Sequence, residues 1–327
     1  MLTLDAQVHV YERDRPERPW LGHLPGPAEA TGAQMVAALE AAGVDGAVVV
    51  ASVILYGYDP SYAESVYDAY PERFALVKPV DPTDPAVAEI VAQWAQRRGT
   101  VGVRLMLTPH GATDPADPGL NLVLAEAGRR GLAVNLYCPG RLGQVAALAA
   151  RHPGTQIVID HLGLFQPKEP PVPEDAFADL PALLALAEFP HVAVKISGAC
   201  TMALEACPYR DLWGPIYRMF DAFGLERCPW GTDWTRASGM LLQAQTPRDV
   251  EALRGLAPGE RRALLGEVLE RRWVAERGDP SKETRELLSF RLSVEAFRAM
   301  DRLSQSDREM LMGGALSKIY GWRPGGR

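Results

Sequence analysis

Eight short runs of aliphatic and β-branched residues recur along the chain, and each is followed by a longer segment of mixed polarity. Continuous apolar runs of this length are typical of parallel strands buried on both faces and separated by crossover helices. The expected strands are Leu2 to Val10, Val44 to Ser52, Phe74 to Val80, Val101 to Leu107, Ala133 to Tyr137, Gln156 to His161, Val192 to Ser197 and Cys228 to Asp233. The expected helices include Ala33 to Ala42, Ala86 to Arg97, Leu120 to Arg130 and Leu142 to Arg151, several of them followed by a glycine typical of a helix C-cap.

Eight strands with helices between them predict an α/β fold, the (β/α)8 TIM barrel. An open doubly wound sheet is the alternative, but no GxGxxG turn follows the first run, so a dinucleotide-binding half is not supported. With 327 residues, 47% of them hydrophobic, the chain can bury the core of one barrel. We therefore expect a single domain over residues 1–327.

The pattern changes after the eighth run. Residues 246–291 are rich in Arg, Glu and Leu, and Leu264, Leu265, Val268, Leu269 and Trp273 follow helical spacing. This predicts a helical insertion after the last strand. A pair of helices that covers the barrel end is the simpler interpretation, and a lid or subunit contact is the alternative.

Charge and cysteine content limit the classes of partner. The formal net charge is -7, without a basic segment, which argues against a nucleic-acid partner. No apolar run reaches the roughly 20 residues needed to cross a bilayer, so we expect a cytoplasmic protein without a membrane partner. The four cysteines form no CxxC pair, which disfavours a thiolate zinc cluster or a disulfide framework. A homodimer is a base-rate expectation.

Three polar residues lie where apolar strands end. His9 closes the first run, His161 closes the sixth, and Asp233 closes the eighth. Packing explains such residues poorly, and the carboxyl ends of barrel strands are where barrel enzymes carry out their chemistry. We therefore expect His9, His161 and Asp233 to meet at one site.

The alternation of side chains along a strand adds further candidates. Asp5, Gln7 and His9 share one face of the first strand, whereas Asp160 is expected to point away from the barrel interior and to support a loop. Inward positions on later strands hold Arg104, Asn135, Tyr137, Lys195 and Ser197. Arg104 and Lys195 would attract an anionic substrate, unless Lys195 pairs with Asp233 or Asp5 and Arg104 anchors a loop.

At these residues the chain resembles the amidohydrolase-related family, in the branch that contains 2-pyrone-4,6-dicarboxylate lactonases and L-fuconolactonase-like enzymes. The resemblance covers six motifs in the family's order. They are DAQVH at 5–9, GVRL at 102–105, IDHLG at 159–163, VKISG at 194–198, WGTDW at 230–234 and GGALSKIYGW at 313–322. It implies a TIM-barrel hydrolase and agrees with the count of strands.

The chain departs from the family pattern in two places. The family's His-x-His on the first strand reads Gln7-x-His9 here, so one metal-ligating imidazole is missing. A divalent, zinc-like site would rest on His9, His161 and Asp233, but an amide is a poor zinc ligand, so we favour catalysis without a metal. The second departure is the insertion at 246–291, which the family pattern lacks.

We therefore expect a hydrolase that acts on a small, carboxylated lactone or ester. Asp233 would activate water, and His9 and His161, with the amide of Gln7, would polarise the carbonyl. Substrate binding is expected from Arg104, Tyr137, Lys195 and Asn135. In a metal-dependent version the ion would replace the histidines as electrophile.

Two alternatives remain open. A decarboxylase of a small aromatic or unsaturated carboxylic acid would use the same strand ends, and carbon dioxide release would distinguish it. A barrel that only binds a small ligand would show no turnover. A serine hydrolase is disfavoured because no Gly-x-Ser-x-Gly motif occurs.

Overall fold

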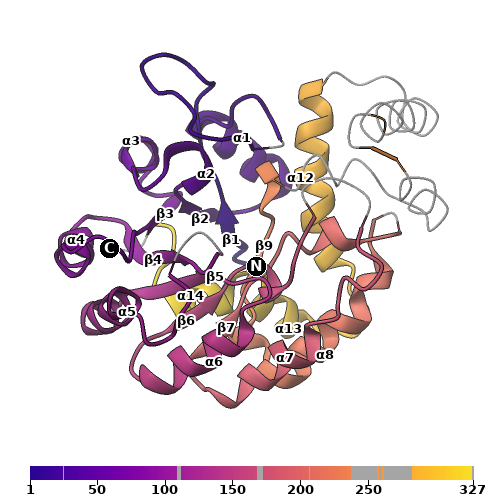
Figure 1. Ribbon diagram of the computed structural model, residues 1–327. Helices are drawn as coiled ribbons and strands as arrows, with labels where there is room; N and C mark the ends of the chain where they lie inside the picture. The colour runs from indigo at the N-terminus through magenta and orange to yellow at the C-terminus, as the bar shows by residue number, and fades with distance from the viewer. Residues whose placement is uncertain are drawn as a thin grey trace.

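A computed structural model describes residues 1–24, 26–108, 112–167, 172–205, 207–236, 256–257, 260 and 282–325, with side chains excepted at 282–289. Seven parallel strands form one sheet in chain order (Figure 1). They are β1 (Leu4–Val8), β2 (Gly46–Val50), β3 (Phe74–Pro79), β4 (Thr100–Met106), β5 (Ala133–Tyr137), β6 (Ile157–Ile159) and β7 (Val192–Val194). All but a few of their residues are buried, as expected of strands covered on both faces.

Two short strands complete the barrel. β8 (Ile196–Ser197) pairs with β9 (Trp230–Gly231), and both lie within strands that the sequence predicts. The predicted seventh strand is split at Lys195, whose backbone N–H still donates to Ile159 O at 2.8 Å. Beyond β9, the N–H of Asp233 donates to Gln7 O at 2.9 Å. The last strand therefore returns to the first, and the predicted (β/α)8 barrel is confirmed.

Helices surround the strands (Figure 1). They are α1 (Gly32–Ala42), α2 (Val53–Tyr56), α3 (Ser61–Ala69), α4 (Val87–Trp94), α5 (Pro118–Arg130), α6 (Leu142–Arg151), α7 (Leu180–Ala185), α8 (Trp213–Phe223), α12 (Lys282–Arg298), α13 (Gln305–Glu309) and α14 (Ala315–Tyr320). Short 3-10 turns cover His161–Gly163, Leu186–Glu188, Ala199–Met202, Arg210–Leu212 and Leu225–Arg227, and Met310–Gly314 is π-helical. The expected glycine C-caps are present at Gly43 and Gly131, both in the left-handed conformation that glycine adopts most easily.

Two apolar clusters hold these elements together. The larger cluster lies between the strands and the surrounding helices. The smaller cluster combines residues of successive strands, including Val48, Ala75, Ala133 and Ala193, with Leu316 of α14. α14 therefore packs against the inner face of the strands, which leaves the carboxyl ends of the strands for polar groups.

Most of the predicted insertion at 246–291 lies outside the described residues, and α12 overlaps its last part. Among the described helices, none is both long and apolar enough to cross a membrane.

A buried carboxyl group lies at the seam between β1 and β9. Asp5 is fully buried and accepts hydrogen bonds from the backbone N–H groups of Gln7, at 2.9 Å, and Thr232, at 3.0 Å, and from the Thr232 hydroxyl. Burial raises the pKa of Asp5 to about 7. Gly231 permits this close approach, since a Cβ there would lie 3.0 Å from both Asp5 Oδ1 and Gln7 N.

We expect Thr232→Val to lower the free energy of unfolding by about 2 kcal/mol, because a buried carboxyl group would lose a hydroxyl donor. Thr83→Val is the matched control, since the Thr83 hydroxyl donates to an exposed carboxylate, that of Asp81. That control should change stability by less than about 0.5 kcal/mol. Urea unfolding of both variants measures the difference, and equal losses would contradict a stabilising role for the Asp5 seam.

Candidate functional site

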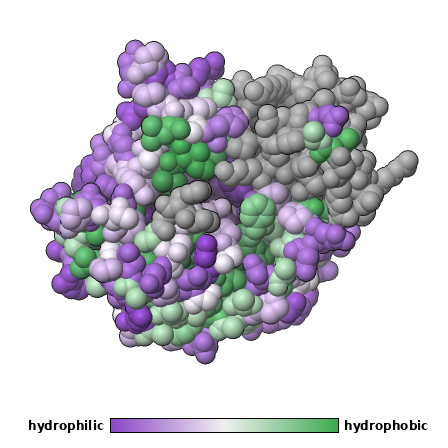
Figure 2. Space-filling view, in the orientation of Figure 1, coloured by the Kyte–Doolittle hydropathy of each residue, from purple (hydrophilic) through white to green (hydrophobic). Residues whose placement is uncertain are grey.

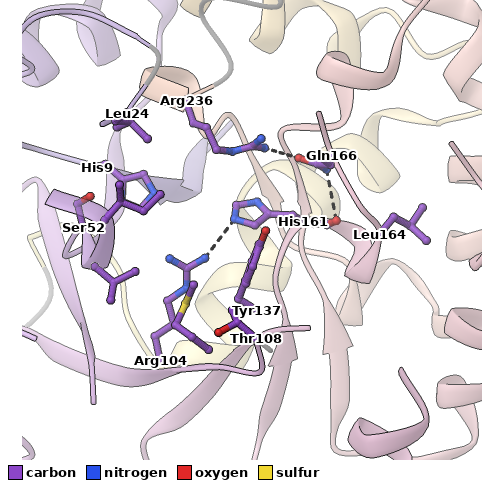
Figure 3. Close-up of a pocket in the computed structure, with 13 residues that line it drawn as sticks. His9, Leu24, Ser52, Arg104, Thr108, Tyr137, His161, Leu164, Gln166 and Arg236 are labelled. Carbon is purple, nitrogen blue, oxygen red and sulfur yellow. Dashed lines mark hydrogen bonds between the residues drawn. The ribbon is translucent and has the colours of Figure 1, made fainter. Parts of the chain in front are cut away.

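A cavity of about 270 Å³ opens at the carboxyl ends of the strands. Four residues predicted from the sequence line it, namely His9, Arg104, Tyr137 and His161 (Figure 3). They reach it from the ends of β1, β4, β5 and β6. The sequence therefore identified strand ends that do converge on one cavity.

The end of β6 departs from regular strand geometry. His161 and Leu162 have φ values of 53° and 60°, a left-handed backbone that non-glycine residues rarely adopt. The strand alternation stops there, so the prediction that Asp160 points away from the barrel interior is wrong. Asp160 Oδ2 instead accepts from Arg104 Nε at 2.7 Å, and its Oδ1 lies 3.1 Å from Lys195 Nζ.

Asp233 lies directly after β9, also with a left-handed φ of 50°. Such conformations are costly and concentrate at functional sites, where the surrounding structure holds them. Its Oδ1 is 3.5 Å from His9 Nε2, and its Oδ2 is 3.6 Å from His161 Nδ1 and pairs with Arg236 Nε. Asp233 is fully buried behind the residues that line the cavity.

Hydrogen-bond partners indicate where the imidazole protons reside. His9 Nδ1 lies 2.7 Å from the carbonyl oxygen of Val50, which only accepts, so Nδ1 carries the proton and Nε2 presents a lone pair. His161 Nε2 lies 3.2 Å from a guanidinium nitrogen of Arg104, which only donates. The proton of His161 is therefore on Nδ1, 3.1 Å from the Ser197 hydroxyl. Burial lowers the pKa of His9 and lowers that of His161 to about 3, so both rings are neutral near pH 7.

Three further predicted residues lie outside the cavity lining. Lys195 is fully buried, and its ammonium group donates to Gln7 Oε1 at 2.7 Å. Asn135 Oδ1 accepts from the hydroxyl of Tyr320 in α14 at 2.9 Å. Gln7, Asn135 and Lys195 therefore support the site from within the barrel, and the geometry gives Asn135 and Lys195 no direct route to a substrate in this cavity.

Each of the two buried carboxylates, Asp160 and Asp233, is paired with cations of the chain. Burial alone would raise the pKa of Asp160, but the nearby charges of Lys195 and Arg104 hold it well below its usual range. Burial likewise opposes the charge of Asp233, and Arg236 and the two histidines lower its pKa. Both carboxyl groups are therefore ionised at neutral pH, and each has a guanidinium group between itself and the cavity.

These donors do not fit a zinc ion held by His9, His161 and Asp233. The imidazole nitrogen of His161 nearest Asp233 carries a proton, and Arg236 occupies Oδ2 of Asp233. His9 Nε2 accepts a hydrogen bond from the Gln7 amide nitrogen at 3.4 Å, so among these three residues the acceptor left without a hydrogen-bond partner is Asp233 Oδ1. Catalytic zinc usually has three protein ligands. In the described part of the chain, no group of three or more His, Cys, Asp or Glu residues is arranged to hold a metal.

Four polar residues of the cavity lining were not predicted from the sequence, namely Ser52, Thr108, Gln166 and Arg236. Ser52 ends a predicted strand, so its position was a usable signal. Gln166 and Arg236 lie in segments that follow β6 and β9, where strand alternation gives no direction. The guanidinium group of Arg236 donates both to Gln166 Oε1 and to Asp233 Oδ2, and so links the two segments.

We expect Lys195→Met to lower the free energy of unfolding by about 3–5 kcal/mol, because it leaves a buried carboxylate without one of its two cations. Lys318→Met, at an exposed position of α14, is the control and should change stability by less than about 0.5 kcal/mol. Guanidinium unfolding followed by circular dichroism gives both values. A loss at Lys195 no larger than the control would mean that this ion pair does not stabilise the barrel.

Comparison with known families gives a match over most of the chain. The profile of a family described as "Amidohydrolase" matches residues 4–267. A 4-sulfomuconolactone hydrolase from Hydrogenophaga intermedia is 28% identical over 221 residues, which cover 64% of this chain and 69% of that protein. An L-fucono-1,5-lactonase from Burkholderia multivorans is 34% identical over 164 residues, which cover 46% of this chain and 53% of that protein.

Solved structures resemble the whole chain. An amidohydrolase from Burkholderia multivorans with bound zinc superimposes with a TM-score of 0.66 at 22% identity, covering 98% of this chain and 99% of that one. A probable 2-pyrone-4,6-dicarboxylic acid hydrolase from Acinetobacter baumannii with bound citric acid gives a TM-score of 0.65 at 19% identity, covering 98% and 100%. At these identities the likeness concerns the fold.

Proposed function

This chain belongs to the amidohydrolase family and is a hydrolase, and we propose that it opens the ring of a small anionic lactone by adding water to the ester carbonyl. One observation carries the proposal: the guanidinium groups of Arg104 and Arg236 line the cavity, whereas Asp160 and Asp233 lie behind them. A cavity with this lining attracts an anion. Two relatives that share part of the sequence are named as lactone hydrolases, which supports the reaction class.

Arg236 is the better placed of the two cations to bind the anionic group of the substrate. It lines the cavity and covers the carboxylate of Asp233, which has no exposed surface of its own. An incoming carboxylate or sulfonate competes with Asp233 for the same guanidinium group. We propose that substrate binding draws Arg236 away and uncovers Asp233 only when a substrate is present.

Asp233 is then the base, as the sequence suggests. Its Oδ1 has no hydrogen-bond partner in the described structure, and the unprotonated Nε2 of His9, which accepts from the Gln7 amide at 3.4 Å, lies 3.5 Å away. A water molecule that donates to Asp233 Oδ1, and to His9 Nε2 in place of the Gln7 amide, would direct its own lone pairs at the lactone carbonyl. Such a pair of acceptors orients and activates the water.

The chemical steps follow from this placement. The water oxygen bonds to the carbonyl carbon, one water proton passes to Asp233, and the π electrons move to the carbonyl oxygen. When the tetrahedral intermediate collapses, the bond from carbon to the ring oxygen breaks, and Asp233 returns the proton to that oxygen. The product is an open-chain hydroxy acid.

The oxyanion needs donors that face the cavity. The N–H groups of His9 and His161 are directed at Val50 and Ser197, so the tautomers favour orientation of water and of Arg104 rather than the predicted polarisation of the carbonyl. Arg104 donates through Nε to Asp160 and through one terminal nitrogen to His161, and a guanidinium group has five N–H donors. We propose that its remaining donors stabilise the oxyanion, in place of the predicted contact with a substrate carboxylate.

The same donor set leads us to propose catalysis without a bound metal. Arg236 at Asp233 and the ammonium group of Lys195 at Gln7 place two cations of the chain itself beside the atoms that a metal would need. Their charge repels a divalent ion and also keeps Asp233 ionised.

We expect a screen of carboxylated and sulfonated lactones, followed by acid release, to identify a substrate. Asp233→Asn should then lower kcat by about 10²–10⁴-fold, because it removes the base. Asp114→Asn, outside the cavity lining, is the matched control and should leave kcat unchanged. Full activity of Asp233→Asn would refute the role of Asp233. Release of carbon dioxide instead of acid would favour the decarboxylase, and binding without turnover would favour a ligand-binding barrel.

We expect activity to survive removal of metals. Protein dialysed against a strong chelator should keep its kcat, and elemental analysis should find much less than one zinc ion per active chain, because the described donors offer no complete zinc site. Added zinc should not increase the rate. Loss of activity on chelation and its recovery with zinc would contradict the metal-free proposal while leaving the lactonase reaction standing.

A further inference from the structure

One side of the cavity is apolar. Leu24, Val53 and Ile54 line it together, and we call these three residues the apolar wall. Figure 3 draws Leu24 next to His9 and Ser52, and it draws His161, Tyr137 and Gln166 on the other side of the cavity. The wall therefore lies across the cavity from the polar groups at the end of β6.

Two elements of the barrel hold the apolar wall in place. Val53 and Ile54 belong to α2, which directly follows β2, and Leu24 comes from the segment between β1 and α1. That segment packs tightly on α2: the N–H of Leu21 donates to Leu55 O at 2.9 Å, and a Cβ on Gly22 would lie 2.9 Å from Ile54 O. The wall is thus held by backbone contacts.

The apolar surface continues outside the cavity. Leu21 is 73% exposed and contacts Gly57, at the end of α2. Figure 2 shows hydrophobic residues gathered in the region where Figure 1 draws α2. Exposed apolar surface therefore lies at the same helix that carries Val53 and Ile54 of the wall.

From these contacts we infer that the substrate carries a small apolar substituent, such as a short alkyl group, on the side of the lactone ring opposite its anionic group. This inference rests on the proposed lactonase function and narrows its substrate class. Burial of each methylene against the wall strengthens binding by about fourfold, the equivalent of about 0.8 kcal/mol. The cavity of about 270 Å³ lies near the lower limit for ligand pockets, so the substituent is short.

The same wall discriminates against a polyhydroxylated lactone. A hydroxyl group that loses water without gaining a hydrogen bond weakens binding by roughly tenfold. Ser52, which directly precedes Val53, and His9 lie beside the wall and offer the polar partners there. A sugar lactone with several hydroxyl groups would leave its other hydroxyl groups unpaired on this side.

Binding of lactams tests the wall separately from catalysis, because a lactam ring resists hydrolysis. We would titrate the full-length protein calorimetrically with carboxylated δ-lactams that bear hydrogen, methyl, ethyl or propyl opposite the carboxylate. The Kd should fall by about fourfold for each added carbon. A dihydroxylated lactam should bind about tenfold more weakly than the unsubstituted one.

Two variants locate the effect. Ile54→Asn should make Kd independent of chain length. Leu122→Asn, at a 46% exposed position of α5, is the matched control and should keep the wild-type dependence. A Kd that does not change with chain length in the wild-type protein, or tighter binding of the dihydroxylated lactam, would overturn the inference. Absence of lactone turnover with chain-length-dependent lactam binding would instead refute the proposed reaction and leave the wall standing.

Discussion

The charge cluster at Asp160 is the interaction on which the site depends. Its carboxylate pairs with Arg104 from β4 and with Lys195 from the junction of β7 and β8, and all three side chains are buried. Taking these charges out of water is costly unless each has a well-placed partner. The cluster therefore fixes the ends of three strands relative to one another, and Arg104 and His161 reach the cavity from two of those ends.

Two residues with a left-handed backbone conformation orient the side chains beneath the cavity. His161 and Asp233 have positive φ values of 53° and 50°, and both turn their side chains toward the same point beneath the cavity. The hydrogen bond from Arg104 to His161 determines which imidazole nitrogen is protonated, and that from His9 to Val50 does the same on the other side. Asp160 therefore influences which nitrogen of His161 is protonated by holding Arg104 in place.

Under the proposed metal-free mechanism, cations of the chain itself lie beside the atoms that a metal would need. Lys195 lies against Gln7, and Arg236 lies against Asp233. Both side chains belong to a member of the amidohydrolase family in which Gln7 stands where a ligating histidine would be expected. Under the proposed mechanism, Asp233 becomes accessible only when an anionic substrate draws Arg236 away. Water is therefore activated only when a substrate is present.

The sequence by itself determined the barrel, the strand ends that converge and the identity of four cavity residues, because apolar runs and their polar ends report burial directly. It misjudged Asp160, because alternation holds only while the backbone is extended and the left-handed turn at His161 ends it. It also could not find Arg236 and Gln166, or separate Lys195 and Asn135 from the cavity lining. Only the tertiary structure decided those points, because ion pairs and hydrogen bonds between strands distant in the sequence determine which way each buried polar side chain turns.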